Sequence, residues 1–514
     1  MVLSPAAHFD RNERDAYFGD RTLSWGKAQM LGPLALKSWD FDAAAHLLVR
    51  AGFGGRTEEI QKLHALGPGK AISSLLDAQA EFYAPPTWAN PQDQDELRYQ
   101  LRDAVTPEQK QSVRKLLNQQ FRYEMRDLTR WWITRMAVTR TPLVEKMTLF
   151  WHGHFATSGQ KVRPAYEMWL QNETLRQNGL GNFANLTKAI SRDPAMMIWL
   201  DIVQSKKGRP NENFAREVME LFTLGEGHYS ESDVKEAARA FTGYRIDRAD
   251  QSFRFAPAQF DSGPKTFMGK NGPWNGDQII DIIVSQPQCA RFIAAKIWKF
   301  FAYEATDPKL IDALANEFRN VRYEIRPFMK SIFSAREFYG PEALNSQIKS
   351  PVQLLVQALR TMPISLPESS VLEFAFRQMG QVPFYPPNVK GWDGGNSWIN
   401  TATLAFRYKL ARQLVEGVDP EEIGLPKPLA MDMGGIRPTT TPALPVDQLI
   451  TTSDRQQPQN VVEKLFVQIF QCSSKFELTT KFREFLSNRR IPIDDSTIRD
   501  LVVLMMTTPN YQVT

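Results

Sequence analysis

The chain has 514 residues, of which 42% are hydrophobic, 11% aromatic and 23% charged. These fractions are those of an ordinary globular protein, and they exclude an intrinsically disordered or a collagen-like chain. The formal net charge is +5, and the sequence contains no run of five like charges. A nucleic-acid-binding function is therefore not expected, because such proteins concentrate basic residues in a patch or stripe.

The sequence also indicates a soluble protein without a transmembrane segment. No stretch approaches the ~18 consecutive apolar residues that cross a bilayer. The first residues mix acids with bases and lack the apolar segment of a secretory signal, which predicts a cytoplasmic location. Cys289 and Cys472 form no CxxC motif, which disfavours a thiolate zinc site. Two buried free thiols are expected, and one long-range disulfide is the alternative.

Helical periodicity dominates the chain. Residues 42–50 are expected to form a helix with Asp42 as its N-cap. Residues 107–138 carry apolar side chains at steps of three and four, as one long helix would. Thr141 and Pro142 are typical of a helix start, with proline at the first helical position. Further helices are predicted over residues 290–303, 308–318, 350–361 and 400–415.

Alternating β patterns are scarce. Residues 251–268 are the best candidate for a short hairpin, because Phe253 and Phe255 alternate before a DSGP turn. The sequence thus predicts a mainly α protein, a multi-helix globular body with at most this hairpin and a flexible Pro/Thr-rich insertion. The expected divisions are an N-terminal extension (1–40), a helical core (41–418), the linker or insertion (419–460) and a C-terminal helical segment packing on the core (461–514).

The first candidate for chemistry is the segment FWHGHF, which holds His152 and His154. Gly153 between them favours a break from helix, and in an extended segment both rings would lie on one side. They could then bind one divalent ion together with ligands from elsewhere in the chain. The alternative is that both rings bond backbone carbonyls near a helix end, with Trp151 and Phe155 in the core.

The second candidate is NENFAREVMELF, residues 211–222, which reads as an amphipathic helix. Glu212, Arg216 and Glu220 recur at i, i+4 and i+8, as in a solvated, salt-bridged face. Glu217 falls at the boundary with the apolar side. A half-buried carboxylate there needs a partner, a metal or a raised pKa.

Two neighbouring segments offer single candidates. GEGHY, residues 225–229, is a glycine-flanked turn that presents His228. Ser230 and Asp233 fit a capping box at the start of the next helix, so Asp233 has a structural role available. Asp201 closes the apolar run PAMMIWL and is either an N-cap or a ligand.

The last candidate is PFYPPNVKGWDGG, residues 383–395, a loop rich in proline and glycine. Its prolines exclude helix and central strand. Rigid prolines and the aromatic Trp392 suit either a binding wall or a packed Ω-loop. The sequence contains no P-loop, GxGxxG fingerprint, GxSxG elbow or HExxH helix.

Four segments resemble the bacterial family catalogued as domain of unknown function 1800. They read AAHLLVRAGFGG, FWHGHFATS, NENFAREVMELFTLGEGHYSESDVKEAARAFTGY and PPNVKGWDGG, and the resemblance runs from about Asp40 to the C-terminus. It implies a mainly helical protein found in bacteria, planctomycetes among them. It also implies gene neighbours of an exported, sulfatase-like family, and with them export as an alternative location. The positions that match are His46, His152, His154, Asp201, Asn211, Glu212, Asn213, Arg216, Glu217, Glu220, Gly225, Asp233, Arg239, Gly243, Lys265, Gly391 and Trp392.

The chain departs from the family pattern twice. Many members carry a histidine where this chain has Gln177 to Phe183, and a second where it has Phe260 before Asp261. If those histidines are ligands in relatives, this chain lacks them or uses a different site.

Two functions from different classes remain open, and the sequence favours the first. The first is a metal-dependent enzyme, in particular a hydrolase acting on an unknown small molecule or polymer. One divalent metal ion would be held by His152, His154, Asp201 and His228, with Glu212 and Glu217 as catalytic carboxylates. The second is a non-catalytic binding or assembly partner of a sulfatase-like protein, in which the same residues form a buried network. In either case the candidate binding residues are Asn211, Asn213, Arg216, Glu220, Lys390 and Trp392.

Overall fold

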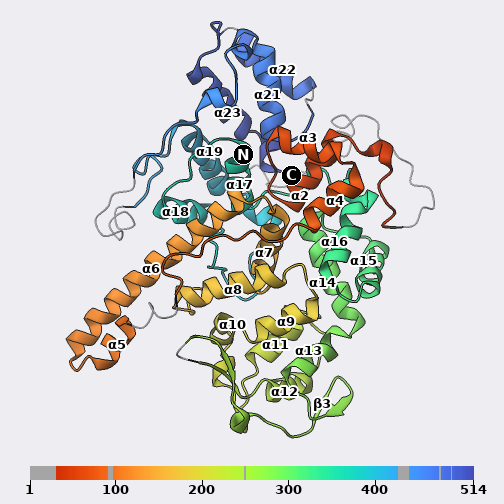
Figure 1. Ribbon diagram of the computed structural model, residues 1–514, viewed down its shortest axis with the longest axis vertical. Helices are drawn as coiled ribbons and strands as arrows, with labels where there is room; N and C mark the ends of the chain where they lie inside the picture. The colour runs from red at the N-terminus through yellow and green to blue at the C-terminus, as the bar shows by residue number, and fades with distance from the viewer. Residues whose placement is uncertain (1–29, 91–95, 248–249, 427–438, 474–475, 488) are drawn as a thin grey trace, which may run out of the picture.

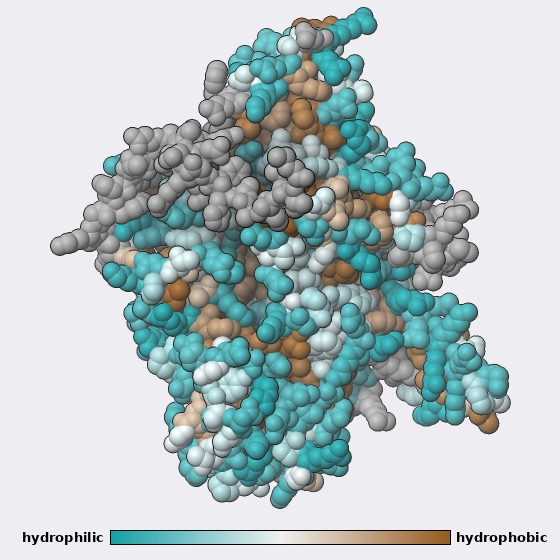
Figure 2. Space-filling model, turned by 180° about the vertical axis from the view of Figure 1, so that it is seen from behind, coloured by the Kyte–Doolittle hydropathy of each residue, from teal (hydrophilic) through white to brown (hydrophobic). Residues whose placement is uncertain are grey.

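The computed structural model describes residues 30–90, 96–247, 250–426, 439–473, 476–487 and 489–514. Helices account for most of this part of the chain, with two small antiparallel sheets, so the predicted mainly α class is confirmed (Figure 1). None of the helices in these ranges is long and apolar enough to cross a membrane. Figure 2 shows one face of the molecule, where hydrophilic residues predominate and apolar areas are small and separated. Cys289 is a buried free thiol, as predicted, whereas Cys472 is only half-buried.

The N-terminal part is a group of three short helices: α2 (Phe41–Ala51), α3 (Thr57–Ala65) and α4 (Pro68–Leu76). The side chain of Asp40 accepts a hydrogen bond from the backbone N–H of Ala43 at 2.9 Å and thereby caps α2. The prediction that Asp42 is the cap was wrong; it lies in the first turn, where an acid also favours the helix dipole.

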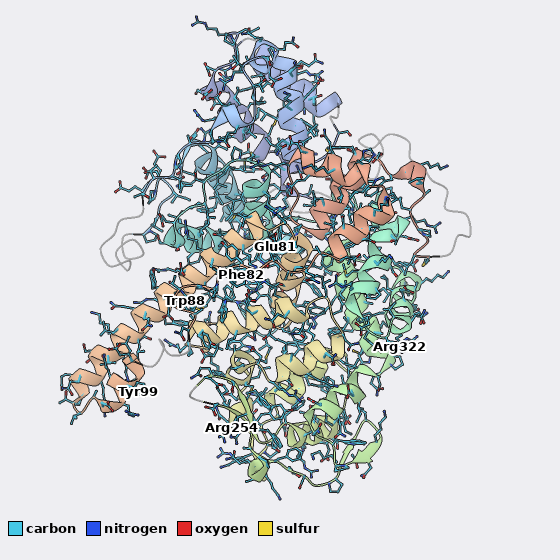
Figure 3. The ribbon with its side chains drawn as sticks, in the orientation of Figure 1. Glu81, Phe82, Trp88, Tyr99, Arg254 and Arg322 are labelled. Atoms are coloured by element: carbon cyan, nitrogen blue, oxygen red, sulfur yellow. The ribbon has the colours of Figure 1, made fainter. Side chains whose placement is uncertain are left out.

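Helices α5 (Glu96–Asp103) and α6 (Pro107–Val138) form an arm that projects from the body (Figure 1). The predicted bounds of α6 are confirmed, and a capping box between Thr106 and Gln109 explains why the helix begins there. Residues 81–88 run along α6, where Trp88 holds them: its indole N–H donates to Asp127 at 2.8 Å (Figure 3). Buried side chains begin only at Glu124, where α6 enters the body.

Helix α7 (Pro142–His154) lies at the centre of the molecule, and every residue from 142 to 152 is buried. It packs against α6 and α8 (Ala165–Asn178). Helix α8 in turn packs against α9 (Phe183–Ser191) and α10 (Pro194–Trp199) (Figure 1). This burial leaves the polar residues of α7 dependent on partners within the protein.

Two apolar cores stabilise the fold. The first joins α2–α4 and α7 to the helices that follow α10. These helices are α11 (Asn213–Glu220), α12 (Glu231–Ala240), α13 (Gly276–Val284), α14 (Pro287–Phe301), α15 (Pro308–Asn320) and α16 (Ile325–Ser334). The predicted helices at 290–303 and 308–318 are thus confirmed with small shifts at their ends.

The second core joins the buried half of α6 to the C-terminal helices. These are α17 (Pro351–Thr361), α18 (Ser369–Met379), α19 (Thr401–Glu416), α21 (Pro458–Phe470), α22 (Phe476–Ser487) and α23 (Asp495–Met506). Leu444, Val446 and Ile450 of the predicted linker are buried in this core. The division into extension, core, linker and C-terminal segment stays a prediction, and residues 1–29 and 427–438 lie outside the described ranges.

The two sheets are hairpins that lie between α12 and α13. Strand β1 (Tyr244–Ile246) pairs with β2 (Phe253–Phe255), and β3 (Lys265–Phe267) pairs with β4 (Lys270–Gly272). The predicted hairpin within 251–268 was wrong in its pairing, because its two halves belong to different sheets. β2 takes the strand before it as partner, where Tyr244 packs edge-on against Phe253.

Candidate functional site

The predicted break at Gly153 was wrong, because α7 continues through His154. In a helix, residues at i and i+2 point to different sides, so His152 and His154 do not share a face. Their surroundings confirm the divergence: one ring lies against the loop 383–395, and the other lies against the end of α11.

The His152 ring is almost fully buried, with 1% of the residue exposed. Its Nε2 accepts a hydrogen bond from the backbone N–H of Phe384 at 3.0 Å. The rings of Trp132, Phe384 and Trp392 surround it at centroid distances of 5.1, 5.0 and 5.7 Å. Burial lowers the pKa of His152 to about 3, so the ring is neutral and its Nδ1 carries the proton.

His154 is buried on the other side of the helix. Its Nε2 lies 3.0 Å from the carbonyl oxygen of Phe222, which fixes the proton on that nitrogen. The remaining Nδ1 lies 3.5 Å from Nζ of Lys296, and this ammonium also donates to the carbonyl of Leu221 at 3.1 Å. Burial and the Lys296 charge lower the pKa of His154 well below its usual value. Burial also lowers the pKa of Lys296 to about 8.

The donor atoms of the two rings determine whether they suit one metal ion. A neutral imidazole binds a metal through its single unprotonated nitrogen. That nitrogen receives the Phe384 N–H in His152 and faces Lys296 in His154. Within the described ranges, no group of three or more His, Cys, Asp or Glu side chains is placed to hold a metal ion. The geometry therefore does not support a shared ion at these rings, and metal binding stays a prediction.

Helix α11 presents a polar face to the surface while Phe214, Ala215, Val218 and Met219 are buried beneath it. Glu212, at the helix start, lies 3.7 Å from Arg216, as the i, i+4 spacing predicts. The Arg216 guanidinium makes its stronger, bidentate contact with Glu231 of α12, at 2.6 and 2.9 Å. This ion pair joins the starts of two helices.

The end of α11 carries the predicted half-buried carboxylate. Burial and the neighbouring Glu220 raise the pKa of Glu217, while Arg216 and Lys390 oppose the rise. Glu220 accepts a hydrogen bond from the hydroxyl of Tyr229. Lys390 is exposed and belongs to the loop 383–395, so a group on this loop and a group on α11 interact electrostatically.

Asp201 lies near the start of α11 and occupies the left-handed backbone region at φ +60°. Its side chain caps no helix; it pairs with Lys161 at 2.8 Å and accepts from Asn213 at 3.4 Å. Asn211 accepts a hydrogen bond from the backbone N–H of Asn213 at 3.0 Å. These contacts connect Asp201 to α11 but not to either of the two histidines.

The turn after α11 holds His228, which is exposed, unlike the two histidines of α7. The capping box that follows is confirmed: Ser230 and Asp233 exchange the expected hydrogen bonds, at 3.1 and 2.9 Å. Asp233 also accepts from the backbone N–H of Met268 at 2.8 Å, which ties α12 to β3 and β4. Asp233 therefore has a structural role.

The loop 383–395 packs on the end of α7. Besides the contact to His152, the carbonyl of Phe384 accepts from the N–H of Gly159 at 2.9 Å. Gly391 has φ +83°, and a Cβ there would overlap the carbonyl oxygen of Gly153. Only glycine suits both the backbone conformation and the close approach. Trp392 is half-buried against His152, whereas Lys390 faces solvent.

Sequence reasoning missed four residues that contact the predicted site residues. Tyr229 and Glu231 adjoin the predicted His228, and their proximity to α11 was a usable signal. Lys161 and Lys296 come from segments distant in sequence, and no local pattern marks them. Their roles follow only from the tertiary packing.

Comparison with known proteins identifies the family but no activity. A family model described as "Protein of unknown function (DUF1800)" matches residues 46–513, nearly the whole chain. No curated protein and no solved structure matches the chain. The chain belongs to the DUF1800 family, as its motifs predicted.

Proposed function

We propose that this member of the DUF1800 family is a non-catalytic binding or assembly protein. Its recognition surface consists of the polar face of α11 (Glu212, Arg216, Glu217, Glu220), the loop 383–395 and Tyr229. Within this surface, Lys390 and the glutamates offer charges of both signs to a partner.

The main support for the proposal is the set of backbone groups that the two buried histidines contact. His152 bonds the backbone of the loop at Phe384, and His154 lies against the carbonyl of Phe222, two residues after α11 ends. Each ring thus attaches one of the two surface segments to the rigid helix α7. A surface that is held in advance loses little conformational entropy on binding, which favours recognition.

The partner we propose is a sulfatase-like protein, which the gene neighbourhood of the family suggests. Polar, mixed-charge surfaces suit protein partners, because paired charges fix the register and exclude wrong partners. A charge reversal within the surface should therefore weaken binding without altering the fold.

The test is co-purification after co-expression with a sulfatase-like protein of the kind that the family's gene neighbours encode. Lys390→Glu should abolish the complex, because it replaces a positive charge that acts on Glu217 with a negative one. Lys409→Glu is the matched control, since Lys409 is an exposed lysine on α19 outside the surface. A complex that survives Lys390→Glu, or no complex with the wild-type chain, contradicts the proposal.

A second candidate function is the hydrolase, and the carboxyl of Glu217 favours it. This group is half-buried with a raised pKa, as general acids and bases often are. In this alternative Glu217 transfers the proton and Glu212 assists, with or without a divalent metal ion supplied from solution. Screening chromogenic esters, phosphate esters and glycosides tests it: turnover lost in Glu217→Gln but retained in Glu226→Gln, an exposed glutamate of the adjacent turn, would support catalysis.

A further inference from the structure

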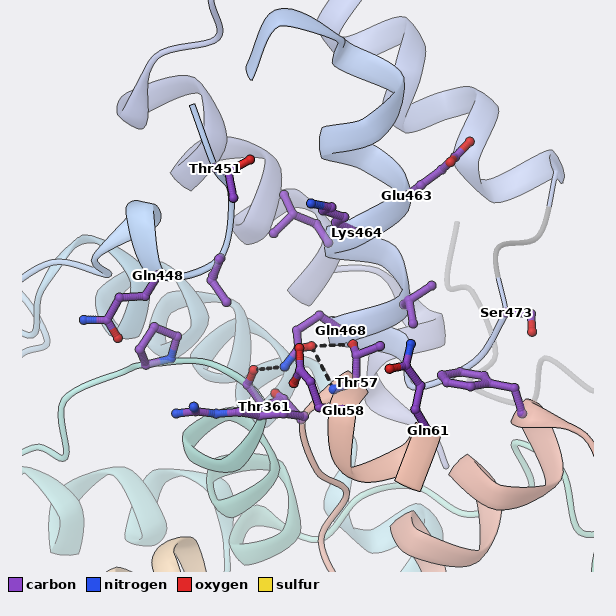
Figure 4. A pocket seen from close by; sticks show the side chains of 16 residues that line it. Thr57, Glu58, Gln61, Thr361, Gln448, Thr451, Glu463, Lys464, Gln468 and Ser473 are labelled. Carbon is purple, nitrogen blue, oxygen red and sulfur yellow. Dashed lines mark hydrogen bonds between the residues drawn. The ribbon is translucent and has the colours of Figure 1, made fainter. Parts of the chain in front are cut away.

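A second site lies far from α7, in a cleft of about 840 Å³ between the N-terminal and C-terminal helices (Figure 4). Its walls come from the start of α3, the end of α17, the segment 448–451 and one face of α21. The volume falls in the range of pockets that bind small organic ligands, roughly 300 to 1,000 Å³. None of the candidate residues of α11 or the loop 383–395 lines it.

The floor of the cleft is held by one side chain. The amide oxygen of Gln468 accepts from both the backbone N–H and the hydroxyl of Thr57, at 3.2 and 2.6 Å. Its amide nitrogen donates to the backbone carbonyl of Thr361. Gln468 therefore joins α3, α17 and α21, as the dashed lines in Figure 4 show, and fixes the shape of the cleft.

The walls carry no net charge. Arg56 and Lys464 are balanced by Glu58 and Glu463. Lys464 is already paired with Asp454 at 2.6 Å, and Glu463 with Arg483 at 2.9 Å. A ligand of high charge of either sign would find little electrostatic attraction here.

The remaining walls combine neutral hydrogen-bonding groups with apolar surface. Seven of the lining residues are glutamine, threonine or serine, and Phe41, Pro363 and Leu449 supply apolar contacts. The amides of Gln61 and Gln448 make no hydrogen bond to other described residues, and both side chains are exposed. Each amide offers a donor and an acceptor.

We propose that this cleft binds a short neutral oligosaccharide. Sugar rings pair apolar C–H faces with hydroxyl groups that point in several directions, which matches amide and hydroxyl side chains beside an aromatic ring. One common way to recognise an extended peptide is through free backbone groups at a sheet edge. The residues that line the cleft belong to helices and short connecting segments and none to a strand, so the cleft favours the sugar.

The test measures binding of the full chain to cellohexaose, xylohexaose, maltohexaose and chitohexaose by calorimetry and saturation-transfer NMR. At least one should bind more tightly than about 1 mM. The double variant Gln61→Ala/Gln448→Ala should weaken that binding about tenfold, since each lost hydrogen bond costs a few-fold in affinity. The matched control is Gln111→Ala/Gln119→Ala, two exposed glutamines on the arm of α6, which should bind as wild type.

Three results would overturn the proposal. One is the absence of binding to all four oligosaccharides. Another is binding that the double variant leaves unchanged. The third is preferential binding of heparin or of a Gly/Ser peptide, which would assign the cleft to a polyanion or to a protein segment instead. Gln468 is left unchanged in all variants, because its loss would disturb the fold itself.

Discussion

At the scale of single residues, the two histidines of α7 illustrate how burial decides chemistry. His152 and His154 are two residues apart, yet one accepts a backbone N–H and the other faces a carbonyl and an ammonium. Both are neutral at physiological pH, because burial disfavours the imidazolium. Because each neutral ring is hydrogen-bonded to a backbone group of another segment, it links that segment to α7.

The neutral state of His152 predicts a pH dependence of stability. Its pKa is about 3 in the folded protein and about 6.5 in an unfolded chain. Below pH 6.5 the unfolded state binds a proton that the folded state does not, so stability falls as the pH decreases. One such group contributes a slope of at most ~1.4 kcal/mol per pH unit.

Denaturant unfolding between about pH 5 and 6 measures this slope. His152→Asn, which keeps a hydrogen-bond acceptor but does not titrate, should show a shallower slope than wild type. His228→Asn is the control, because that side chain is exposed. Equal slopes in all three proteins would contradict the assignment of a buried, neutral His152.

The loop 383–395 provides a second residue-scale prediction. Gly391→Ala should cost about 3 kcal/mol, because the Cβ meets the Gly153 carbonyl and the backbone is left-handed. Gly395→Ala should cost only about 1 kcal/mol, since Gly395 is left-handed at φ +55° but faces open space. Thermal unfolding of both variants checks the difference, and equal losses would show that the loop is not packed as described.

At the scale of elements, helices with a regular apolar period were predictable. Polar contacts were predictable only where both partners lie close together in the sequence. The capping box at Ser230 is local, so the sequence predicts it correctly. The cap of α2 was misplaced by two residues because Asp40 and Asp42 are equivalent locally. The partner of β2 depended on Tyr244, which lies outside the window that the alternating pattern covers.

The candidate site likewise contains some features that local spacing predicts and others that only the tertiary packing determines. The half-buried Glu217 and the Glu212–Arg216 pair follow from helical spacing within one segment. The roles of the two histidines depend on Phe384 and Phe222, which lie 232 and 68 residues away in the chain. Only the packing of α7 decides which backbone groups these rings meet.

The elements around α7 are joined by a buried ion-pair network. Glu145 of α7 pairs with Arg135 of α6 and Arg176 of α8, each at 2.7 Å, and accepts from the indole of Trp132 at 2.9 Å. Burial alone would raise the pKa of Glu145, but the two guanidinium groups hold it below its usual value. The network thus stays charged inside the protein.

Removal of this carboxylate charge should be costly. We expect Glu145→Gln to lower the free energy of unfolding by about 3 to 5 kcal/mol, because two buried cations lose their buried shared carboxylate and are left with the less buried Glu173. Glu416→Gln should cost less than about 1 kcal/mol, since its pair with Arg412 is exposed. Urea unfolding of both variants checks this, and a small loss for Glu145→Gln would show that solvent or another acid neutralises the arginines.

At the scale of the whole molecule, α7 connects the two cores. Met147 and Phe150 pack in the first core, and Leu149 packs in the second. The arm of α5 and α6 projects from this body, and residues 107–123 of α6 have no buried side chain (Figure 1). The second core depends on residues after 460, among them Val461, Leu465 and Ile498.

This arrangement predicts that the C-terminal helices are required for folding. A chain ending at residue 460 would expose the apolar faces of α17 and α19, which α21 and α23 cover. It should bind a hydrophobic dye and lose its cooperative thermal transition, whereas the full chain should unfold cooperatively. Cooperative unfolding of the shortened chain would instead make residues 461–514 a dispensable segment.

The central claim is that His152 and His154 hold two surface segments in place rather than a metal ion. Elemental analysis of the chelator-treated protein after incubation with zinc, manganese and iron tests it most directly. We expect a substoichiometric metal content that is the same in wild type, His152→Ala and His154→Ala, with both variants less stable. One equivalent of metal in the wild type, lost in both variants while they remain folded, would contradict the account and establish the metal site.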